Sequence, residues 1–433
     1  MKIAIIGSGI SGLVTAYKLH QEHEVTVFEA NDYIGGHTNT RMIESGGRKL
    51  AIDTGFIVFN DRTYPNFIRL LDELNVRSRP TSMSFSVRNN RTGLEYNGTS
   101  LNGVFAQRSN LLKPKFYRFL SEILRFNKAG TDLALSPGDE TITVDEFLRE
   151  RQYSRFFADH YLLPMGAAIW SCPPETFSQF PMQFIAQFYH HHGLLSLRNR
   201  PTWRVIEGGS QEYVNRLTAG FRDRIKLRTP VLSARRGEDS VCLELTGGEQ
   251  HEFDEVIFAC HSDQALAILR DADEIERELL AQFPYSRNSA VLHTDTSLLP
   301  QRERAWASWN YHIREDDNCR ATVTYNMNML QHLDSEQTWC VTLNETDLID
   351  PAKIVYRAEY SHPVFTMSRL AAQQRHQEVI RRNRTSFCGA YWGNGFHEDG
   401  VNSALAVVKW FQSETWQKST PASSLAFASG NRS

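Results

Sequence analysis

The stretch Lys2-Ile3-Ala4-Ile5-Ile6-Gly7-Ser8-Gly9-Ile10-Ser11-Gly12 decides the fold. Its mostly apolar start predicts a buried strand over 2–6, and the pattern Gly-x-Gly-x-x-Gly predicts a tight turn that opens a helix over about 11–21. A second strand is predicted over 24–29. Together these elements form a βαβ unit, the building block of a doubly wound parallel sheet in an α/β protein.

The glycine turn predicts a dinucleotide-binding site. Gly7 permits the tight turn, Gly9 lets the backbone approach a pyrophosphate, and Gly12 lets the helix pack closely on the strand. The first helical residues, Ile10 and Ser11, offer N–H groups and the positive end of the helix dipole to phosphates.

A carboxylate and a second glycine pair follow at suggestive distances. Glu29 ends the second strand, where it can accept hydrogen bonds from both ribose hydroxyls of a dinucleotide. The next stretch, Ala30-Asn31-Asp32-Tyr33-Ile34-Gly35-Gly36-His37-Thr38, has two glycines that allow the backbone to lie along an elongated cofactor.

This second stretch resembles the flavoprotein superfamily that includes monoamine oxidases and phytoene desaturases. The resemblance implies FAD as the cofactor, a Rossmann-like FAD-binding domain of the glutathione-reductase type, and a discontinuous α+β substrate domain. In that superfamily an arginine usually follows the glycine pair. Here His37 takes its place, so the charge at this position depends on pH.

Two later segments match the plan of the same superfamily. Residues 203–210 look like its mid-chain Gly-Gly segment, and Val231 occupies the place where such proteins contact adenine through the backbone. Residues 385–400 resemble the C-terminal flavin segment, in which a helix N-terminus stabilises negative charge on the reduced flavin. The cofactor contacts implied there are Gly389, Gly395, Phe396, Asp399, Gly400 and Val401. Asp399 fits equally well as only the N-cap of that helix.

The alternation of patterns predicts two discontinuous domains. An FAD-binding domain is predicted over 1–62, 203–266 and 366–412, and a substrate domain over 63–202 and 267–365. The segment from about Thr63 to Arg200 is predicted to be helical and rich in aromatic residues. Residues 413–433 are rich in Ser and Ala, which predicts a disordered tail.

Composition excludes several functional classes. With 47 Lys+Arg against 50 Asp+Glu the net charge is −3, which does not favour a nucleic-acid binder held by phosphate contacts. No apolar run reaches the roughly 20 residues that cross a bilayer, and the opening strand leaves no room for a signal peptide. The six cysteines are scattered, which suits a reducing compartment. We therefore expect a cytoplasmic protein.

Finer details narrow the resemblance. Residues 292–295, 360–365 and 395–400 look like a bacterial family of FAD-dependent oxidoreductases that is similar to the flavin domain of plant cyclopropane fatty acid synthases. Members often accompany cyclopropane-type lipid methyltransferases. The resemblance implies a lipid or fatty-acyl substrate and a lipid methyltransferase as a partner.

Three histidines are candidates for a catalytic base. Hydride abstraction from an alkyl chain requires an apolar tunnel and one group that takes the second proton. His397 is the first candidate because it lies in the predicted flavin-facing turn, and His293 and His362 follow. A structural histidine bonded in the interior is an equally good reading of each. Metal binding is not expected, because the adjacent His190, His191 and His192 point in different directions on a helix.

Aromatic residues on predicted strands suggest a substrate cavity. Trp309 and Tyr325 could line it, and the neighbouring Asn326 is unusual for a core strand, although aromatic residues on strands are more often simple core. Phe396 stands where amine oxidases commonly have a tyrosine, and the segment 288–295 lacks their lysine. Both departures disfavour amine oxidation, which remains the alternative to an acyl-chain oxidoreductase. A flavin-binding subunit without activity is a third hypothesis.

One segment indicates contact with a membrane. Between Arg108 and Lys128, basic residues alternate with leucines and phenylalanines. A basic amphipathic helix can lie in the headgroup plane of an anionic bilayer, here the inner face of the membrane. The alternative is a helix that packs its apolar face on the protein itself.

Overall fold

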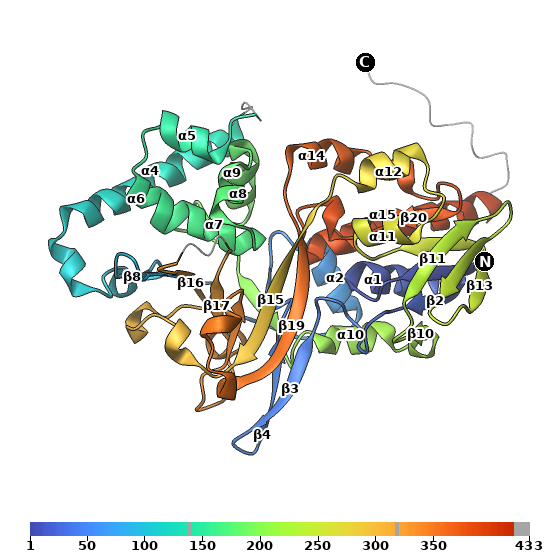
Figure 1. Cartoon of the computed structure of the whole chain (residues 1–433), viewed down its shortest axis with the longest axis horizontal. Helices are drawn as coiled ribbons and strands as arrows, with labels where there is room; N and C mark the ends of the chain where they lie inside the picture. The colour runs from blue at the N-terminus through green and yellow to red at the C-terminus, as the bar shows by residue number, and fades with distance from the viewer. Residues whose placement is uncertain (137–140, 317–319, 420–433) are drawn as a thin grey trace. The chain divides into compact units, whose positions relative to one another are not determined.

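The computed structural model describes residues 1–136, 141–316 and 320–419 (Figure 1). The chain forms two compact units, each assembled from distant segments. The first unit consists of Met1–Gly36, Leu217–Gln282 and the C-terminal segment from Ala371. The second unit consists of His37–Arg216 and Phe283–Leu370.

A five-stranded parallel sheet forms the base of the first unit, with the order β10-β2-β1-β14-β20. Its strands in chain order are β1 (Lys2–Ile6), β2 (Glu24–Phe28), β10 (Ile225–Lys226), β14 (Glu255–Phe258) and β20 (Thr385–Phe387). Ile3, Ala4 and Ile5 of the central strand have no exposed surface, as expected for a parallel strand covered on both faces. The Rossmann-like α/β prediction is confirmed.

Helices and a small antiparallel sheet complete the first unit. Helix α1 (Ile10–Leu19) packs against α15 (His397–Ser419), so segments far apart in the sequence lie side by side. The other elements of this unit are β11 (Val231–Arg236), β12 (Val241–Leu245), β13 (Gln250–Phe253), α11 (Ser262–Ile268) and α12 (Glu274–Leu280). Helix α15 continues to Ser419, past the point at residue 413 where a disordered tail was predicted. The rest of that predicted tail, 420–433, lies outside the described residues.

A mixed seven-stranded sheet forms the base of the second unit, with the order β19-β15-β18-β17-β16-β7-β8. All neighbours are antiparallel except β16 and β7. Its strands in chain order are β7 (Phe85–Asn89), β8 (Leu94–Asn97), β15 (Tyr285–His293), β16 (Trp309–Ile313), β17 (Val323–Asn326), β18 (Cys340–Leu343) and β19 (Ile354–Pro363).

Helices make up most of the segment from Thr63 to Arg200, but the prediction of helices throughout is wrong for β6 (Ser78–Pro80), β7 and β8. These strands are held by distant partners, for example the bond from the Ser86 hydroxyl to Asn310, 224 residues away. The helices are α2 (Pro65–Glu73), α3 (Leu101–Val104), α4 (Pro114–Leu135), α5 (Val144–Glu150), α6 (Arg155–Phe157), α7 (Leu163–Trp170), α8 (Pro174–Ser178) and α9 (Met182–His191).

The boundaries between the units differ from the predicted ones. Residues 37–62 and 203–216 lie in the second unit, where β5 (Phe59–Asn60) and β6 pair with β9 (Trp203–Ile206). Residues 267–282 lie in the first unit, where Glu276 of α12 forms a buried ion pair of 2.6 Å with Arg236 of β11. The remaining helices are α10 (Gln211–Thr218), α13 (Met327–Gln331) and α14 (Met367–Gln374).

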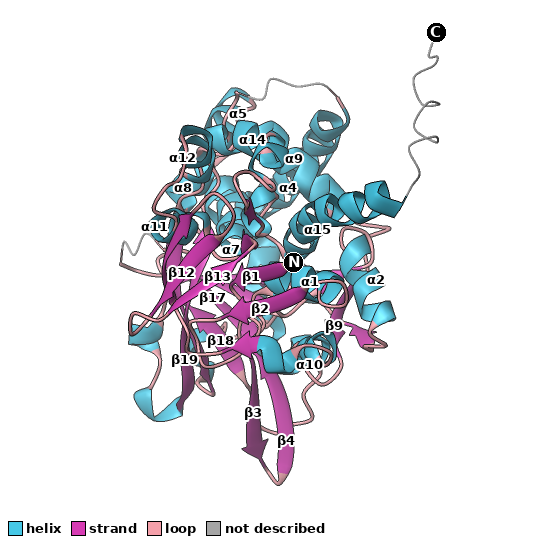
Figure 2. Ribbon diagram, turned by 90° about the vertical axis from the view of Figure 1, so that its right-hand side faces the viewer, coloured by secondary structure: helices cyan, strands magenta, loops and turns pink. Residues whose placement is uncertain are grey.

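A buried carboxylate joins three elements of the second unit. Asp53 ends β4 (Arg48–Asp53), which forms a hairpin with β3 (Thr40–Ser45) (Figure 2). It accepts hydrogen bonds from the Ser210 N–H (2.9 Å), the Thr40 hydroxyl (2.5 Å) and the Gln331 amide (2.9 Å), which belong to the residue before α10, to β3 and to α13. Burial nevertheless raises the pKa of Asp53 to about 6, and the bonds from Ser210 and Thr40 only partly oppose that effect.

We expect Asp53 to make stability depend on pH. Its folded-state pKa of about 6 exceeds the ordinary 3.8, so the folded chain binds more protons between these values and stability falls as pH rises from about 4 to 6. A shift of this size corresponds to roughly 3 kcal/mol. Asp53→Asn removes the titrating group. The free energy of unfolding, measured with urea, should therefore differ between variant and parent by an amount that changes by roughly 3 kcal/mol across this pH range. A difference that stays constant with pH would contradict the raised pKa of Asp53.

No helix within the described residues is long and apolar enough to cross a membrane.

Candidate functional site

The glycine turn forms an open cradle in the first unit. Gly9 is the N-cap of α1 with ordinary φ of −70°, and a Cβ built there would meet nothing within 4 Å. By contrast, a Cβ on Gly7 would lie 2.7 Å from the Ala259 carbonyl oxygen, and one on Gly12 would collide with the carbonyl oxygen of Gly7. The turn is therefore crowded on its inner side and open at Gly9.

The second glycine pair lies against this cradle. Gly35 and Gly36 have φ of +130° and +60°. Only glycine adopts the first value without strain, and residues other than glycine rarely adopt the second. A Cβ on Gly36 would stand 3.1 Å from the Gly9 Cα. The Gly35 N–H also donates to the Ser8 hydroxyl at 3.3 Å. Both glycine segments thus border one space.

Glu29 closes the cradle at the end of β2. One carboxylate oxygen accepts from the Ser8 N–H (2.9 Å) and hydroxyl (2.6 Å), and the other from the Asn31 N–H and side-chain amide, both at 2.8 Å. These four hydrogen bonds from the protein itself fix the position of the carboxylate. Ser8 and Asn31 were missed from the sequence, although their places inside the first glycine motif and two residues after Glu29 were a usable signal.

The segment before Val231 runs beside Glu29. The Thr229 N–H donates to the Glu29 carbonyl at 2.8 Å, and the Arg228 N–H donates to the Asn31 carbonyl at 2.9 Å. Val231 itself is buried at the start of β11, whereas Ala30 is exposed. The structure thus brings the predicted adenine-contacting segment next to the predicted ribose-binding carboxylate.

The C-terminal segment meets the same helix N-terminus. The Ser11 hydroxyl donates to the Gly400 carbonyl at 2.9 Å across 389 residues, and a Cβ on Gly400 would lie 2.6 Å from Ile10. Ser403 accepts from the Gly389 N–H at 2.9 Å, and Val401 is fully buried. Residues that the sequence assigned to one cofactor site therefore converge from both ends of the chain.

Asp399 caps the helix that begins at His397. Its carboxylate accepts from the Phe396 N–H at 2.8 Å, so it lies in the first turn of α15 and reaches back, as the acidic member of a capping box does. Gly395 before it has φ of +93°. The turn 389–395 is supported by Gln373, whose amide donates to the Tyr391 carbonyl at 2.8 Å. The prediction that Asp399 is the N-cap is wrong in position, because the helix begins two residues earlier and Asp399 reaches back to the N–H of Phe396.

This arrangement fits FAD. The space at Gly9, the N–H groups of the first turn of α1 with no side-chain cap, and a fixed carboxylate at the strand end are what a pyrophosphate and an adjoining ribose require. The α15 N-terminus would offer its positive dipole end to negative charge on the flavin. The Cys388 thiol is fully buried, and burial raises its pKa to about 12.

His397 is a buried, neutral imidazole. Burial lowers its pKa to about 3, so at neutral pH the ring is uncharged and is a weak base. It is the first residue of α15, and the prediction that this turn faces the flavin stays a prediction.

In the second unit, His37 and His362 lie close together. The His37 ring stacks on Tyr360 with centroids 4.9 Å apart and lies 5.3 Å from His362. The Thr38 hydroxyl is 2.5 Å from that of Tyr213. Tyr360 and His362 alternate along β19 and so share one face of the seven-stranded sheet.

His293 points to the opposite face of that sheet and has a structural role. Its Nδ1 accepts from the Asp295 N–H at 3.0 Å, so Nε2 carries the hydrogen and donates to the Thr342 hydroxyl at 2.7 Å. Both nitrogens are used within the sheet, and burial lowers the pKa of His293 to about 4. These bonds support the alternative reading of His293 as a structural histidine, and its role as a catalytic base stays a prediction.

Trp309 and Tyr325 lie opposite each other on neighbouring strands, with ring centroids 4.9 Å apart. The strand register places them on the same sheet face as Tyr360 and His362. Asn326 points the other way. Its side-chain oxygen accepts from the Met329 N–H and caps α13, so Asn326 has a structural role, and a substrate contact there stays a prediction.

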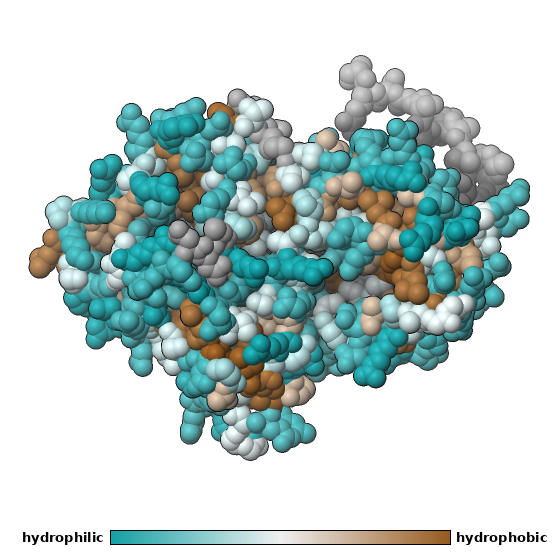
Figure 3. Space-filling model, in the orientation of Figure 1, coloured by the Kyte–Doolittle hydropathy of each residue, from teal (hydrophilic) through white to brown (hydrophobic). Residues whose placement is uncertain are grey.

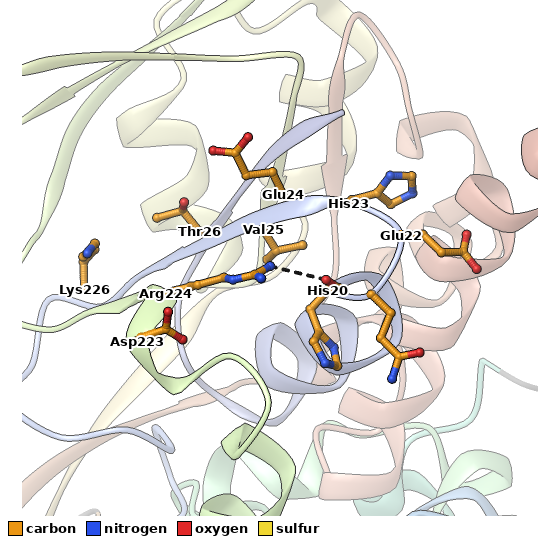
Figure 4. Close-up of a pocket in the computed structure, with 10 residues that line it drawn as sticks. His20, Glu22, His23, Glu24, Val25, Thr26, Asp223, Arg224 and Lys226 are labelled. Atoms are coloured by element: carbon orange, nitrogen blue, oxygen red, sulfur yellow. Dashed lines mark hydrogen bonds between the residues drawn. The ribbon is translucent and has the colours of Figure 1, made fainter.

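A polar hollow elsewhere in the first unit is separate from the cradle. It measures about 560 Å³ and lies at the amino end of β2, beside His20–His23 (Figure 4). Arg224 reaches across it and donates to the His20 carbonyl at 3.3 Å. Ligands of doubly wound sheets bind at the carboxyl ends of the strands, so this hollow is not the cofactor site. Within the described ranges, no three His, Cys, Asp or Glu side chains could hold a metal ion.

Comparisons with known proteins agree with this geometry. A family model described as "Flavin containing amine oxidoreductase" matches residues 10–300. A flavin-containing amine oxidase A from Canis lupus familiaris is 25% identical over 267 residues, which is 59% of this chain and 49% of that relative's length. The chain thus spans about half the length of the curated relative it matches.

Two solved structures show the same fold. Cyclohexylamine oxidase from Brevibacterium oxydans IH-35A aligns with a TM-score of 0.68 at 18% identity, covering 95% of this chain and 99% of that one. A CLA-producing fatty acid isomerase from P. acnes aligns with a TM-score of 0.66 at 16% identity, covering 94% and 98%.

Proposed function

Because the chain belongs to the flavin containing amine oxidoreductase family and has FAD as its cofactor, we propose that it is an oxidoreductase acting on a lipid acyl chain. When bound, FAD supplies hydride transfer between a C–H bond and flavin N5. The chain's own residues bind the acyl chain, exclude water and exchange the accompanying proton.

The observation that carries the proposal is the chemistry of one sheet face. From β16 to β19, strand register places these side chains on the face that bears His362: Trp309, Tyr311, Ile313, Val323, Tyr325, Val341, Leu343, Asn288, Ala290, Leu292, Tyr356, Ala358 and Tyr360. None of these side chains carries a full charge. Such a face suits an apolar chain and offers no carboxylate to hold an ammonium group.

His397 and His362 are the two candidates for the proton-exchanging group. His397 is neutral by burial, and His362 lies on the uncharged face with its Nδ1 3.1 Å from the Asn288 amide. A neutral imidazole can take the second proton that desaturation releases and can return it in the reverse reduction. A shared fold with a fatty acid isomerase supports an acyl chain as a substrate class for this architecture.

Amine oxidation is the second candidate, favoured by the names of the amine oxidase relatives. Phe396 in place of the usual tyrosine and the uncharged sheet face weigh against it. The third candidate is a flavin-binding partner of a lipid methyltransferase that has no enzymatic activity of its own.

Mass spectrometry of phospholipids incubated with the FAD-loaded protein tests the proposal. With oxygen present to reoxidise the flavin, we expect acyl chains, methyl-branched ones first, that have lost two hydrogens; a gain of two hydrogens is expected only when the flavin has first been reduced with dithionite. His397→Gln and His362→Gln should be compared, with His293→Gln as the control for a buried histidine outside the site. Oxidation of small amines with unchanged lipids would establish the amine oxidase instead.

A further inference from the structure

A group of exposed apolar side chains stands out on the second unit, on α3, η1 (Arg108–Leu112) and the start of α4. We call it the leucine surface, made of Leu101, Leu111, Leu112 and Tyr117. These side chains are 79%, 45%, 88% and 48% exposed, respectively. Figure 3 shows hydrophobic atoms at the left edge of the molecule, where Figure 1 has this region. Large apolar side chains gathered in this way mark an interaction site.

The leucine surface rests on a packed scaffold. The Phe105 ring lies 5.6 Å from Phe116 and 6.0 Å from Tyr117, and the Tyr117 hydroxyl donates to the Leu111 carbonyl at 2.9 Å. Phe116 and Phe119 of α4 are buried in the unit. The predicted alternative, a helix that packs its apolar face on the protein, thus accounts for the phenylalanines but not for the leucines.

Within residues 98–131, the segment that carries the leucine surface, the exposed charges have one sign. Residues 98–131 contain a single acid, Glu122, which is 5% exposed and accepts from the Ser154 hydroxyl and the Arg118 guanidinium (3.4 Å). The same segment exposes six cations: Arg108, Lys113, Lys115, Arg118, Arg125 and Lys128. The exposed charge of residues 98–131 is therefore entirely positive, although the whole chain is slightly negative; the exposed Asp132 follows near the end of α4.

Helix α4 extends the same combination along its length. Tyr117, Leu124 and Leu135 are separated by seven and eleven residues, which places them on one side of a helix with 3.6 residues per turn. All three are exposed, at 48%, 54% and 69%. Arg125 and Lys128 lie beside them in sequence and are also exposed.

We propose that the leucine surface and the basic residues around it bind the surface of an anionic lipid bilayer. The leucines enter the boundary between headgroups and acyl chains, and the cations remain among the anionic headgroups. A protein partner would need acidic groups matched to six scattered cations, whereas an anionic bilayer meets them at any spacing. The inference is independent of the proposed substrate, because it depends only on residues 98–135.

Co-sedimentation of the full FAD-loaded chain with vesicles tests the proposal. We expect binding to vesicles of phosphatidylglycerol and phosphatidylcholine in equal parts, weak binding to phosphatidylcholine alone, and loss of binding between about 0.1 and 1 M salt. Leu112→Glu should lower the partition coefficient at least about tenfold, since it removes a leucine that enters the bilayer and adds an anion. Lys113→Glu with Lys115→Glu should have an effect of similar size.

Matched exposed residues serve as controls. Leu197→Glu changes a leucine that is 70% exposed outside this surface, and Lys49→Glu changes an exposed lysine of β4. Neither should alter binding. Equal losses in the controls, or equal binding to neutral vesicles, would overturn the proposal. The proposal would also be overturned if the protein did not bind vesicles but formed a concentration-dependent dimer that Leu112→Glu abolishes.

Discussion

Replacing Gly9 with valine is expected to leave the chain folded and to weaken FAD binding by about 100-fold or more. A Cβ at this position meets nothing within 4 Å in the protein, so we expect the cost in stability to be that of changing an N-cap glycine, about 1 kcal/mol. The same space must admit the pyrophosphate, whose displacement loses two or three charge-assisted hydrogen bonds of about 1.5–3 kcal/mol each. Fluorescence titration with FAD and a thermal melt of the apoprotein measure the two effects separately.

Two other glycines provide the controls for Gly9. Gly12→Val brings a side chain onto the Gly7 carbonyl, where only backbone movement could relieve it, so about 3 kcal/mol or more of stability should be lost. Gly98→Val also enters open space, but in the second unit, and should leave both stability and FAD affinity nearly unchanged. If Gly9→Val bound FAD with normal affinity, the pyrophosphate would not lie in the space at Gly9.

Replacing Glu29 with alanine should weaken FAD binding by roughly 100-fold. The carboxylate would lose its bonds to the ribose hydroxyls, each worth about 1.5–3 kcal/mol when one partner is charged. The Ser8 hydroxyl would also lose its 2.6 Å partner, so the glycine turn would be less well ordered.

Equilibrium FAD titration measures the effect of Glu29→Ala. Asp32→Ala is the matched control, because Asp32 is 62% exposed at its side chain and only contacts Arg228 at 3.5 Å. We expect no more than a twofold change there, typical of a surface ion pair. Equal effects of the two substitutions would show that Glu29 does not contact the cofactor.

The cofactor half of the site could be predicted from local sequence. A strand, a glycine turn and an acid at the next strand end fix each other's positions over some 30 residues, as in any βαβ unit. The convergence of Ser11 with Gly400 followed only because the C-terminal segment resembled a known plan. Ser8 was missed because its bond to Glu29 depends on how the turn folds back.

The substrate half could be predicted only in part, because it depends on strand register. Adjacent strand residues point to opposite faces, so an aromatic or histidine can be recognised in sequence without its face being known. Tyr325 and Asn326 are consecutive and point to opposite faces of the sheet, as do Leu292 and His293. The parallel pairing of β7 with β16 likewise has no local signature.

The most direct test of an acyl-chain oxidoreductase is the visible spectrum of the FAD-loaded protein under anaerobic conditions as phospholipid with methyl-branched or cyclopropane acyl chains is added. We expect the absorption band of the oxidised flavin to bleach with lipid and to recover when oxygen is admitted, while small amines leave it unchanged. Bleaching by small amines with no response to lipid would instead establish an amine oxidase.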